Sequence, residues 1–255
     1  MSDAEKEIQQ LKKRLMELAE KSSRQGIFTF TQFLSLSEQD VFWQVKKDVE
    51  YAGFTLFGGT ERAERVVIRF GDPEELGYEV EFPVKCIHIM PLLPKFADSL
   101  SHRDFLGAIM NLGIERSTIG DILVGEKEAY VFCLEQVLGF ICDNLDKIKH
   151  TNVKCVVADS AAQIAEEEPE VKKVQVSSLR ADAMIAKVYN RSRSECLELF
   201  QSGRVFIDGR LCENNSRILK SGETVNARGY GKFVLSGEPG VTKKGKVSAE
   251  VLVYR

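Results

Sequence analysis

Residues 177–232 decide the fold of the C-terminal third; their sequence is SSLRADAMIAKVYNRSRSECLELFQSGRVFIDGRLCENNSRILKSGETVNARGYGK. Ser192 stands three residues before Glu195, the spacing of a capping box, in which the hydroxyl and the carboxylate each satisfy a backbone N–H of the first helical turn. A helix is therefore predicted from Arg193, and Gly203 supplies the left-handed residue that favours its end. The apolar residues of this helix fall on one face: Cys196, Leu199 and Phe200.

A second helix and several strands complete a small module around this helix. The upstream helix begins after Ser177 and Ser178, and Asn190-Arg191-Ser192 joins it to the next one, so the pair resembles a helix-turn-helix hairpin. Downstream, Asp208-Gly209 is a pair that supplies positive φ at both positions of a two-residue hairpin turn. Strands are predicted before this turn, after it and beyond the next turn: 204–207, 210–212 and 224–227.

Basic side chains are concentrated in the same stretch. Residues 177–232 hold ten Lys or Arg and six Asp or Glu, a net charge of +4, and many of the arginines stand at caps and turns. That placement favours phosphate contact over packing. Arg191 and Arg193 flank the helix cap, where a phosphate would also meet free N–H groups and the positive end of the helix dipole. Each arginine alone is equally well interpreted as solvated surface charge, but together they favour RNA binding.

The order RADAMIAKVYNRSRSECLELFQSGRVFIDGRLCEN, followed by LKSGETV and GYGKF, resembles the αL-type RNA-binding domain named after a small-subunit ribosomal protein. The same domain occurs in heat-shock RNA-binding proteins, pseudouridine synthases and tyrosyl-tRNA synthetases. One departure is Ala181, where the family usually has leucine; it affects a core contact, since Arg180 and Asp182 remain. The resemblance implies RNA contacts at ten positions, the first two being the strongest candidates: Arg180, Arg191, Ser192, Arg193, Arg204, Arg210, Arg217, Lys220, Arg228 and Lys232.

Length and charge place this module within a larger chain. The chain has 255 residues, 44% of them hydrophobic, which is enough for two or three domains with buried cores. Residues 176–255 hold 14 basic and 8 acidic residues, a net charge of +6, whereas residues 1–175 hold 21 and 30, a net charge of −9. A basic module joined to an acidic body would bind nucleic acid locally without the whole molecule adhering to any polyanion.

The sequence disfavours several classes of protein. None of the six cysteines forms a C-x-x-C pair, so neither a zinc knuckle nor a disulfide framework is indicated, and no metal or cofactor is expected. The charged N-terminus lacks the apolar core of a signal peptide, and no run approaches the ~18 apolar residues of a membrane span. We therefore expect a cytoplasmic protein without membrane contact, acting as a monomer.

Residues 1–82 are predicted to form an N-terminal α+β region. Apolar residues recur at helical spacing over residues 4–20, which predicts a helix packed on its own domain, with a coiled-coil partner as the alternative. A second helix is predicted to open at Ser37, where Asp40 occupies the capping-box position. The aromatic side chains of that helix are interpreted as core rather than as a base-stacking site.

Two strands follow in the same region. Residues 54–57 and 65–70 are predicted to pair, and the loop between them begins with Gly58 and Gly59. These glycines would permit close approach of another backbone or a phosphate. The signal for a phosphate loop is weak, because no Lys-Ser or Lys-Thr follows.

Residues 83–158 give the order strand, helix, strand, strand, helix, strand. This βαββαβ order is that of ferredoxin-like and RNA-recognition folds. Bases would then stack on aromatic residues of the first and third strands. The third strand offers Tyr130 and Phe132, but the first offers only His88, so recognition by this sheet is doubtful. The predicted elements are 84–90, 102–112, 119–124, 128–134, 135–145 and 153–157.

An acidic run that ends in Pro169 separates this domain from the basic module. Residues 159–176 are therefore interpreted as a linker, which leaves residues 177–255 for the αL-type RNA-binding domain. The predicted fold class is α+β: an N-terminal α/β region, a central ferredoxin-like or RNA-recognition-like domain, and a small C-terminal αL-type domain.

His102-Arg103-Asp104 invites a catalytic interpretation that fails. The triplet matches the catalytic loop of a protein kinase, but Asn111 follows seven residues after the aspartate rather than five, and no glycine-rich phosphate loop or Asp-Phe-Gly is present. A capping box from Ser101 to Asp104 explains the segment better, and it leaves Arg103 exposed at the start of a helix.

The same segment, SHRDFLGAIMNLGIERSTIGDILVGE, together with FTLFGGTERAERVV upstream and the module downstream, resembles the bacterial YlmH family over nearly the whole chain. The resemblance implies a protein of ribosome-associated quality control. Such a protein would bind large-subunit rRNA and tRNA on large subunits obstructed by peptidyl-tRNA, while the stalled nascent chain is extended with alanine. The family was first linked to cell division. Arg103 and Arg116 are weaker candidates for RNA contact, with a structural role equally well supported.

Two alternatives remain open beside non-catalytic RNA binding. An RNA-modifying enzyme would need a catalytic aspartate in an Arg-Leu-Asp context for pseudouridine synthesis, or a glycine-rich cofactor turn for methyl transfer, and the sequence has neither. We therefore expect no enzyme activity. A cell-division-linked interaction protein could instead use the N-terminal helix to bind its partners.

Overall fold

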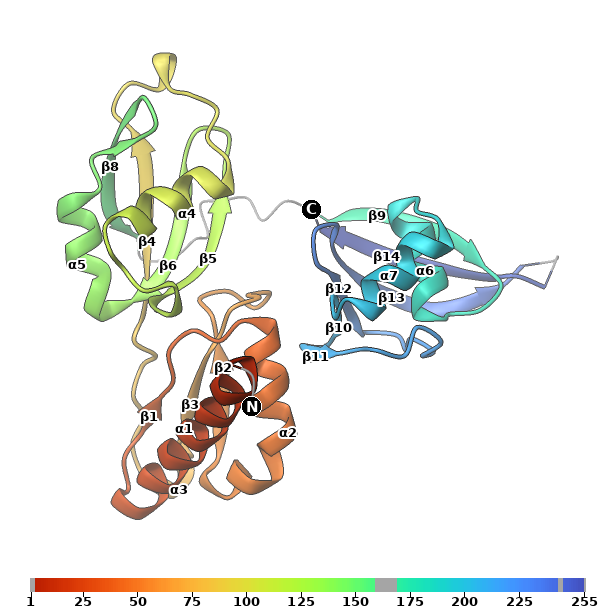
Figure 1. Ribbon diagram of the computed structural model, residues 1–255, viewed down its shortest axis with the longest axis horizontal. Coiled ribbons are helices and arrows are strands. Elements are labelled where there is room, and N and C mark those ends of the chain that lie inside the picture. The colour runs from red at the N-terminus through yellow and green to blue at the C-terminus, as the bar shows by residue number, and fades with distance from the viewer. Residues whose placement is uncertain (1–2, 159–168, 243–244, 255) are drawn as a thin grey trace. The chain divides into compact units, whose positions relative to one another are not determined.

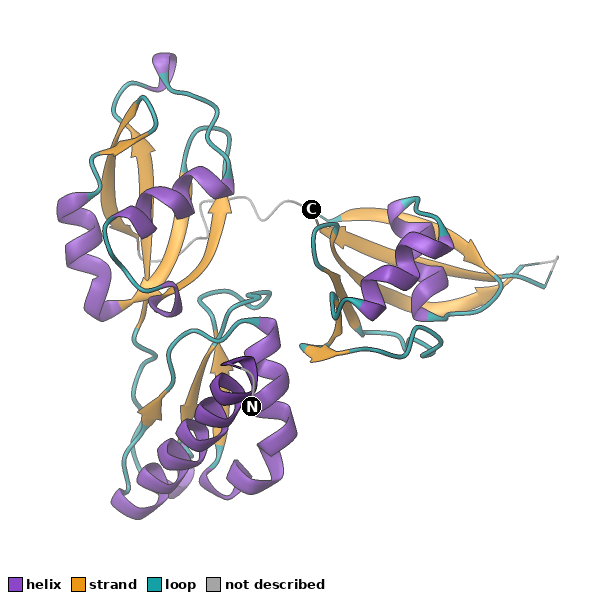
Figure 2. Cartoon of the chain, in the orientation of Figure 1, coloured by secondary structure: helices purple, strands orange, loops and turns teal. Residues whose placement is uncertain are grey.

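The computed structural model describes residues 3–158, 169–242 and 245–254. The chain divides into two compact units, residues 1–166 and 167–255 (Figure 1). The N-terminal unit contains two hydrophobic cores joined by a third cluster, and the C-terminal unit contains one. Helices and strands mix in both units (Figure 2), so the predicted α+β class is confirmed.

The first part of the N-terminal unit packs two helices on a small antiparallel sheet of order β1-β3-β2. Leu15 and Leu18 of the first helix are buried beside Phe42, so this helix packs on its own domain. The second helix is capped by Ser35 with Glu38, not by the predicted Ser37. The elements are α1 (Asp3–Gln25), β1 (Thr29–Phe30), α2 (Leu36–Val49), η1 (Glu50–Ala52), β2 (Phe54–Phe57), β3 (Val67–Phe70) and α3 (Pro73–Leu76).

The second part of this unit is the predicted βαββαβ domain, extended by one short strand. Its antiparallel sheet has the order β5-β6-β4-β8-β7, and α4 and α5 cover one face (Figure 1). Ile87 and Val131 of the sheet pack against Phe105 and Ile109 of α4. The elements are β4 (Val84–Pro91), η2 (Pro94–Phe96), α4 (His102–Asn111), η3 (Arg116–Thr118), β5 (Ile119–Val124), β6 (Ala129–Leu134), α5 (Glu135–Asn144), β7 (Lys147–Ile148) and β8 (Thr151–Ala158).

The part of the other face that contains Tyr130 and Phe132 is covered by the N-terminal part of the same unit, whereas Val156, opposite His88 on that face, is 41% exposed. Tyr130 and Phe132 are only 1% and 3% exposed, packed in a cluster with Phe33 and Val67. The ring of His88 stacks on Tyr130 with 4.2 Å between centroids. The doubt about base stacking on this sheet is therefore justified at Tyr130 and Phe132, because protein side chains already cover both rings.

The glycine-rich loop after β2 makes this closure possible. Gly59 has φ +102°, and a Cβ added to it would lie 2.1 Å from Cδ1 of Phe132. The backbone N–H groups of Glu64 and Arg65 both donate to the carboxylate of Asp121, at 2.6 and 3.1 Å. The close approach that the glycines permit is thus to an aromatic ring of the central sheet, and the phosphate-loop interpretation is not needed.

The C-terminal unit is a six-stranded antiparallel sheet with α6 and α7 on one face (Figure 2). Its strand order is β11-β10-β12-β13-β14-β9, and its core includes Met184, Ile185, Phe200, Val225 and Phe233. The elements are β9 (Glu170–Val176), α6 (Ala181–Tyr189), α7 (Arg193–Gln201), β10 (Val205–Ile207), β11 (Arg210–Leu211), β12 (Thr224–Ala227), β13 (Gly231–Val241) and β14 (Val247–Tyr254).

Strand β9 shows that the predicted linker, residues 159–176, is wrong for residues 170–176. Residues 170–176 pair with β14 in register from Val176 opposite Val247 to Glu170 opposite Val253. The remainder of the predicted linker, residues 159–168, lies outside the described residues. Val174 and Val176 alternate with polar residues and are buried in the core of the C-terminal unit, which is why the segment forms an edge strand.

Candidate nucleic-acid interface

The turn between α6 and α7 is built as the sequence predicts. The backbone N–H of Ser192 donates to Glu195 Oε2 at 2.8 Å, and the N–H of Glu195 donates to the Ser192 hydroxyl at 3.2 Å. The backbone and hydroxyl of Ser192 lower the pKa of the Glu195 carboxyl. Asn190 ends α6 in the left-handed conformation, with φ 53° and ψ 54°. This geometry fixes the direction in which the residues before α7 project.

Three of the predicted arginines gather around the turn between β12 and β13. We call Arg191, Arg204, Arg228 and Tyr230 the turn cluster. The Arg191 guanidinium lies 5.0 Å from the centroid of the Tyr230 ring and 3.4 Å from Glu195. Arg204 Nη2 donates to the carbonyl of Arg228 at 2.6 Å, and the Arg228 guanidinium lies 4.7 Å from the ring centroid of Phe206.

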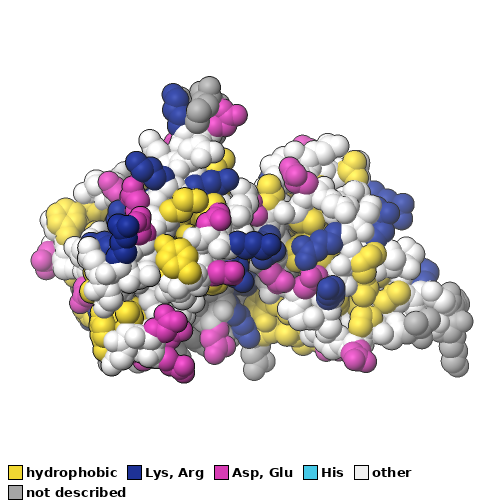
Figure 3. All heavy atoms as spheres, turned by 90° about the horizontal axis from the view of Figure 1, so that it is seen from below, with side chains coloured by type: hydrophobic (Ala, Val, Ile, Leu, Met, Phe, Trp, Pro, Cys, Tyr) yellow, Lys and Arg dark blue, Asp and Glu magenta, His cyan; other side chains and the backbone are white. Residues whose placement is uncertain are grey.

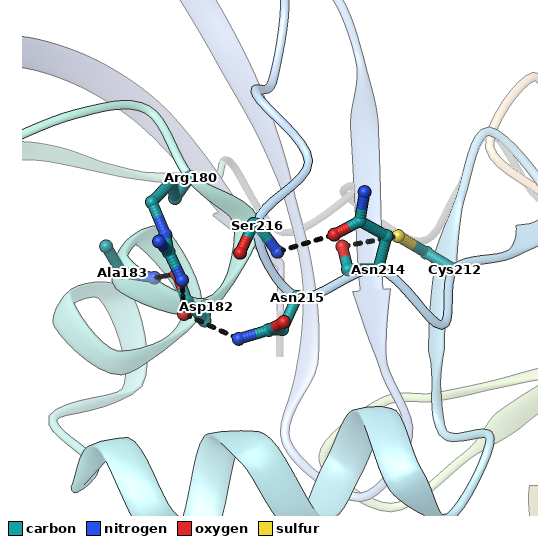
Figure 4. Close-up of polar contacts among 7 residues, drawn as sticks. All are labelled: Arg180, Asp182, Ala183, Cys212, Asn214, Asn215 and Ser216. Carbon is teal, nitrogen blue, oxygen red and sulfur yellow. Dashed lines mark hydrogen bonds and ion pairs between the residues drawn. The ribbon is translucent and has the colours of Figure 1, made fainter.

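Two more predicted arginines lie near the N-terminus of α6, in a group that we call the loop cluster: Arg180, Asp182, Asn215 and Arg217. Arg180 Nε and Nη2 donate to the two carboxylate oxygens of Asp182 at 3.1 and 2.7 Å (Figure 4). Asn215 Nδ2 donates to the same carboxylate at 3.0 Å. Arg217 Nη2 donates to Glu223 at 2.7 Å.

The loop cluster holds Arg180 in one orientation. Desolvation alone would raise the pKa of Asp182, but hydrogen bonds from Arg180 and from the backbone N–H of Ala183 outweigh it, and the pKa is lowered. The backbone supports the same arrangement, since Asp182 N–H donates to the Asn215 carbonyl at 3.1 Å. The side chain of Arg180 is still 41% exposed, so its guanidinium is fixed while it faces solvent.

The structure does not bring the other predicted residues into either cluster. Arg193 and Arg210 are exposed, on the first turn of α7 and on the short edge strand β11. The Lys232 ammonium lies 5.7 Å from the ring centroid of Tyr254. Lys220 lies in the turn before β12 and is exposed. Figure 3 shows Lys and Arg side chains, in blue, interspersed with hydrophobic side chains on the C-terminal unit at the right of the view.

The two weaker candidates lie in the N-terminal unit and differ from each other. Arg103 is exposed in the first turn of α4, beside the predicted capping box of Ser101 and Asp104, which the structure confirms. Lys149 and Ser101 lower the pKa of Asp104 to about 2. Arg116 instead donates to the carbonyls of Ile119 and Gly120, and burial, followed by the charge of Arg65, lowers its pKa to about 10. Of the two, Arg103 is exposed and Arg116 is held by backbone carbonyls.

The sequence interpretation missed Tyr230, which belongs to the turn cluster, and Lys172, which lies beside it. Lys172 of β9 and Tyr230 line a hollow of about 370 Å³ together with Arg191. Lys172 was assigned to a linker, and Tyr230 was read only as part of the pattern GYGKF. The signal that could have found Lys172 is the alternation of residues 171–176, VKKVQV, which is typical of a strand with one buried face.

The described residues offer no group of three or more His, Cys, Asp or Glu side chains that could hold a metal ion. The six cysteines carry no disulfide, and burial raises the pKa of the Cys133 thiol to about 12. A search of the helices in the described ranges finds none long and apolar enough to cross a membrane. What the site presents is therefore oriented cations beside aromatic rings.

The chain is similar to known proteins over most of its length. The family model described as "Putative RNA-binding domain in YlmH" matches residues 78–162. A relative from Bacillus subtilis (strain 168), named "Ribosome-associated protein quality control protein P2", is 31% identical over 222 residues, which cover 85% of this chain and 83% of the relative. The chain belongs to the YlmH family.

A solved structure is also similar to this YlmH-family chain. It is titled "Cell division protein ylmH from Streptococcus pneumoniae" and is 24% identical, with a TM-score of 0.46 over 62% of this chain and 93% of that one. The matched family model spans the central βαββαβ domain, whereas the two arginine clusters lie in the C-terminal unit. In this YlmH-family protein the C-terminal unit thus holds a candidate RNA-binding surface in addition to the domain that the family model describes.

Proposed function

We propose that this YlmH-family protein is a non-catalytic, cytoplasmic RNA-binding protein that binds the large ribosomal subunit. It would contact rRNA and peptidyl-tRNA through its C-terminal unit, in quality control of stalled nascent chains. The observation that carries RNA binding is the pair of arginine clusters, in which carboxylates and aromatic rings hold guanidinium groups that face solvent. The name of the Bacillus subtilis relative supports the assignment to the ribosome.

Fixed arginines suit a ligand with a regular array of phosphates. A guanidinium already oriented by Asp182 loses little side-chain entropy when it meets a phosphate, and its planar fork can donate two parallel hydrogen bonds. Each phosphate that is neutralised also releases counterions, which makes the affinity depend steeply on salt. The net charge of +6 on residues 176–255 also attracts a polyanion such as RNA.

Two carboxylates of the C-terminal unit support a binding role, because each holds a neighbouring group in place. Asp182 accepts hydrogen bonds from Arg180, Asn215 and the backbone of Ala183. Glu195 accepts from the helix cap at Ser192. Both lowered pKa values mean that these groups stay ionised near neutral pH, so they position cations and are poor proton donors.

The test measures binding of the purified protein to purified large ribosomal subunits by co-pelleting at increasing KCl. A variant carrying Arg180→Gln and Arg191→Gln should bind more weakly and show a slope of log affinity against log salt that is shallower by roughly two units at most. The matched control carries Arg14→Gln and Arg24→Gln, which remove two exposed arginines of α1, each also in an ion pair.

The control should keep the affinity and the salt slope of the native protein. The control should melt close to the native temperature, because exposed ion pairs contribute only about 0–1 kcal/mol each. The Arg180→Gln, Arg191→Gln variant should show a modest further decrease, because Asp182, whose side chain is 14% exposed, loses its charged partner. Equal salt slopes for the two variants would contradict the proposal. So would a large loss of folding in the Arg180→Gln, Arg191→Gln variant, because those arginines would then be structural.

A further inference from the structure

A hollow of about 370 Å³ opens at one end of the C-terminal sheet, beside the turn cluster. Its volume falls within the range of sites that hold small ligands. Four segments meet around it: strand β9, the end of α6 with the turn that follows it, the turn between β12 and β13, and strand β14. The side chains that carry the argument are Lys172, Tyr189, Asn190, Arg191, Tyr230 and Val253.

The walls of the hollow suit the flat face of a nucleobase. The Tyr230 ring carries the Arg191 guanidinium 5.0 Å from its centroid, and the Tyr189 ring lies 5.9 Å away at an interplanar angle of 42°. Unpaired bases stack on tyrosine rings and on guanidinium planes. Val253 is buried and contributes an apolar floor. The stacking surface is therefore assembled before any ligand arrives.

The rim supplies the polar groups that a nucleotide needs. The side chain of Lys172 is 29% exposed and therefore half-buried at the edge of the hollow, and its ammonium lies 3.4 Å from the Glu170 carboxylate. Asn190 is exposed, and its side-chain amide offers both a donor and an acceptor to the edge of a base. Glu195 also neighbours Arg191, but the helix cap at Ser192 holds that carboxylate.

We propose that this hollow receives one unpaired nucleobase of the bound RNA. The base would stack on the Tyr230–Arg191 pair, and its phosphate would lie against Lys172. This inference rests on the proposed RNA-binding function and adds to it a preference for RNA with a bulged or looped-out nucleotide. The cations at the rim favour RNA over an apolar protein segment, and the volume accommodates one nucleotide rather than a helix.

Strand β9 places Lys172 at the hollow and also supplies a control residue, Lys173. Lys172 precedes the segment 177–232 that carries the RNA-binding pattern, and it reaches the hollow only because β9 pairs with β14. Its neighbour Lys173 has a side chain that is 78% exposed and lies 3.8 Å from Glu250. Since adjacent side chains of a strand point to opposite faces, Lys173 provides a control of equal charge that does not line the hollow.

The experiment uses the full-length protein and two RNA hairpins, one fully paired and one with a single bulged 2-aminopurine. Native protein should bind the bulged hairpin more tightly by about 5- to 100-fold, the range expected from stacking one base on an aromatic side chain. Binding should also change the 2-aminopurine fluorescence, because this probe responds to stacking. Tyr230→Leu and, separately, Lys172→Gln should reduce the preference for the bulge, and Lys173→Gln should retain it.

The outcomes separate this inference from the function on which it rests. Equal affinity of native protein for both hairpins, or an unchanged preference in Tyr230→Leu and Lys172→Gln, would overturn the base site and leave RNA binding intact. Failure of native protein to bind either hairpin would overturn both. Thermal melting of each variant checks that it is folded. If Tyr230→Leu does not fold, Lys172→Gln tests the base site, since Lys172 is at the rim of the hollow and not in the core.

Discussion

Replacing Gly59 with alanine would drive a methyl group into the ring of Phe132 and disturb the packing of the N-terminal part on the central sheet. The added Cβ would lie 2.1 Å from Cδ1 of Phe132 and 2.3 Å from its Cε1. Both atoms belong to a ring that is 3% exposed and packed beside Phe33 and Val67, so the ring has little room to move. The substitution therefore tests whether the loop at Gly59 packs on Phe132 of the central sheet.

The expected cost has two parts. Gly59 has φ +102°, where an L-residue is strained, and this part is about 1–2 kcal/mol. Inserting a methyl group into a packed core adds about 1–3 kcal/mol. The free energy of unfolding of the N-terminal unit should fall by the sum, roughly 2–5 kcal/mol, which corresponds to a melting temperature lower by about 5–15 °C.

Trp43 makes the measurement specific to this unit. It is the one tryptophan of the chain and lies on α2, with its ring centroid 5.0 Å from that of Phe42. Thermal or urea unfolding followed by tryptophan fluorescence therefore reports the N-terminal unit. Gly77→Ala is the matched control, because Gly77 also has positive φ, +76°, but nothing lies within 4 Å of its added Cβ.

Gly77→Ala should lose only the backbone part, about 1 kcal/mol. Introducing Gly59→Ala into a Phe132→Leu background should cost less than in native protein, with a coupling of about 0.5–3 kcal/mol. Equal unfolding curves for Gly59→Ala and Gly77→Ala would refute the packing of the loop on Phe132, and with it the claim that Phe132 is closed to RNA.

Three further changes test other parts of the structure. Asp182→Asn should lower the free energy of unfolding by about 1–3 kcal/mol at pH 7 in urea titrations, because Arg180 loses its ionic partner. Since the native pKa of Asp182 is lowered, its contribution is present above the ordinary value near 3.8 and is lost as pH falls below it, so the variant and native protein should converge in acid. Ser192→Ala should cost about 0.5–2 kcal/mol in the same titration, since it removes a helix cap. Cys133, whose pKa is about 12, should resist a thiol reagent at pH 8 until the protein is unfolded, as mass spectrometry of labelled peptides would show.

Features held by neighbours in sequence could be predicted. The capping boxes at Ser101 and Ser192 formed as expected, and Asp208 and Gly209 adopt φ 50° and 75° in the predicted hairpin turn. Each depends on groups within three residues of one another. The wrong prediction of the cap at Ser37 also concerns residues close in sequence. The segment SLSEQD contains two serines, and Ser35 forms the capping box because Glu38, three residues later, is the residue type that a capping box prefers there.

Features made by distant segments could not be predicted. Residues 129–134, AYVFCL, are a continuous apolar run, which fits a strand buried on both faces, but only the tertiary structure shows that Phe33 covers the side of Tyr130 and Phe132. Strand β9 needs β14 as its partner, and the two are more than seventy residues apart in sequence. The hollow beside Tyr230 depends on β9 in turn, so Lys172 could not be assigned to the site from its own neighbours.

The most direct test of the central claim is sucrose-gradient sedimentation of tagged protein from a bacterial lysate, with detection in the free, large-subunit and whole-ribosome fractions. Native protein and the Arg14→Gln, Arg24→Gln control should migrate with the large subunit, whereas the Arg180→Gln, Arg191→Gln variant should remain at the top of the gradient. Native protein confined to the top, or both variants migrating with the large subunit to the same extent, would contradict RNA binding by the C-terminal unit on the ribosome.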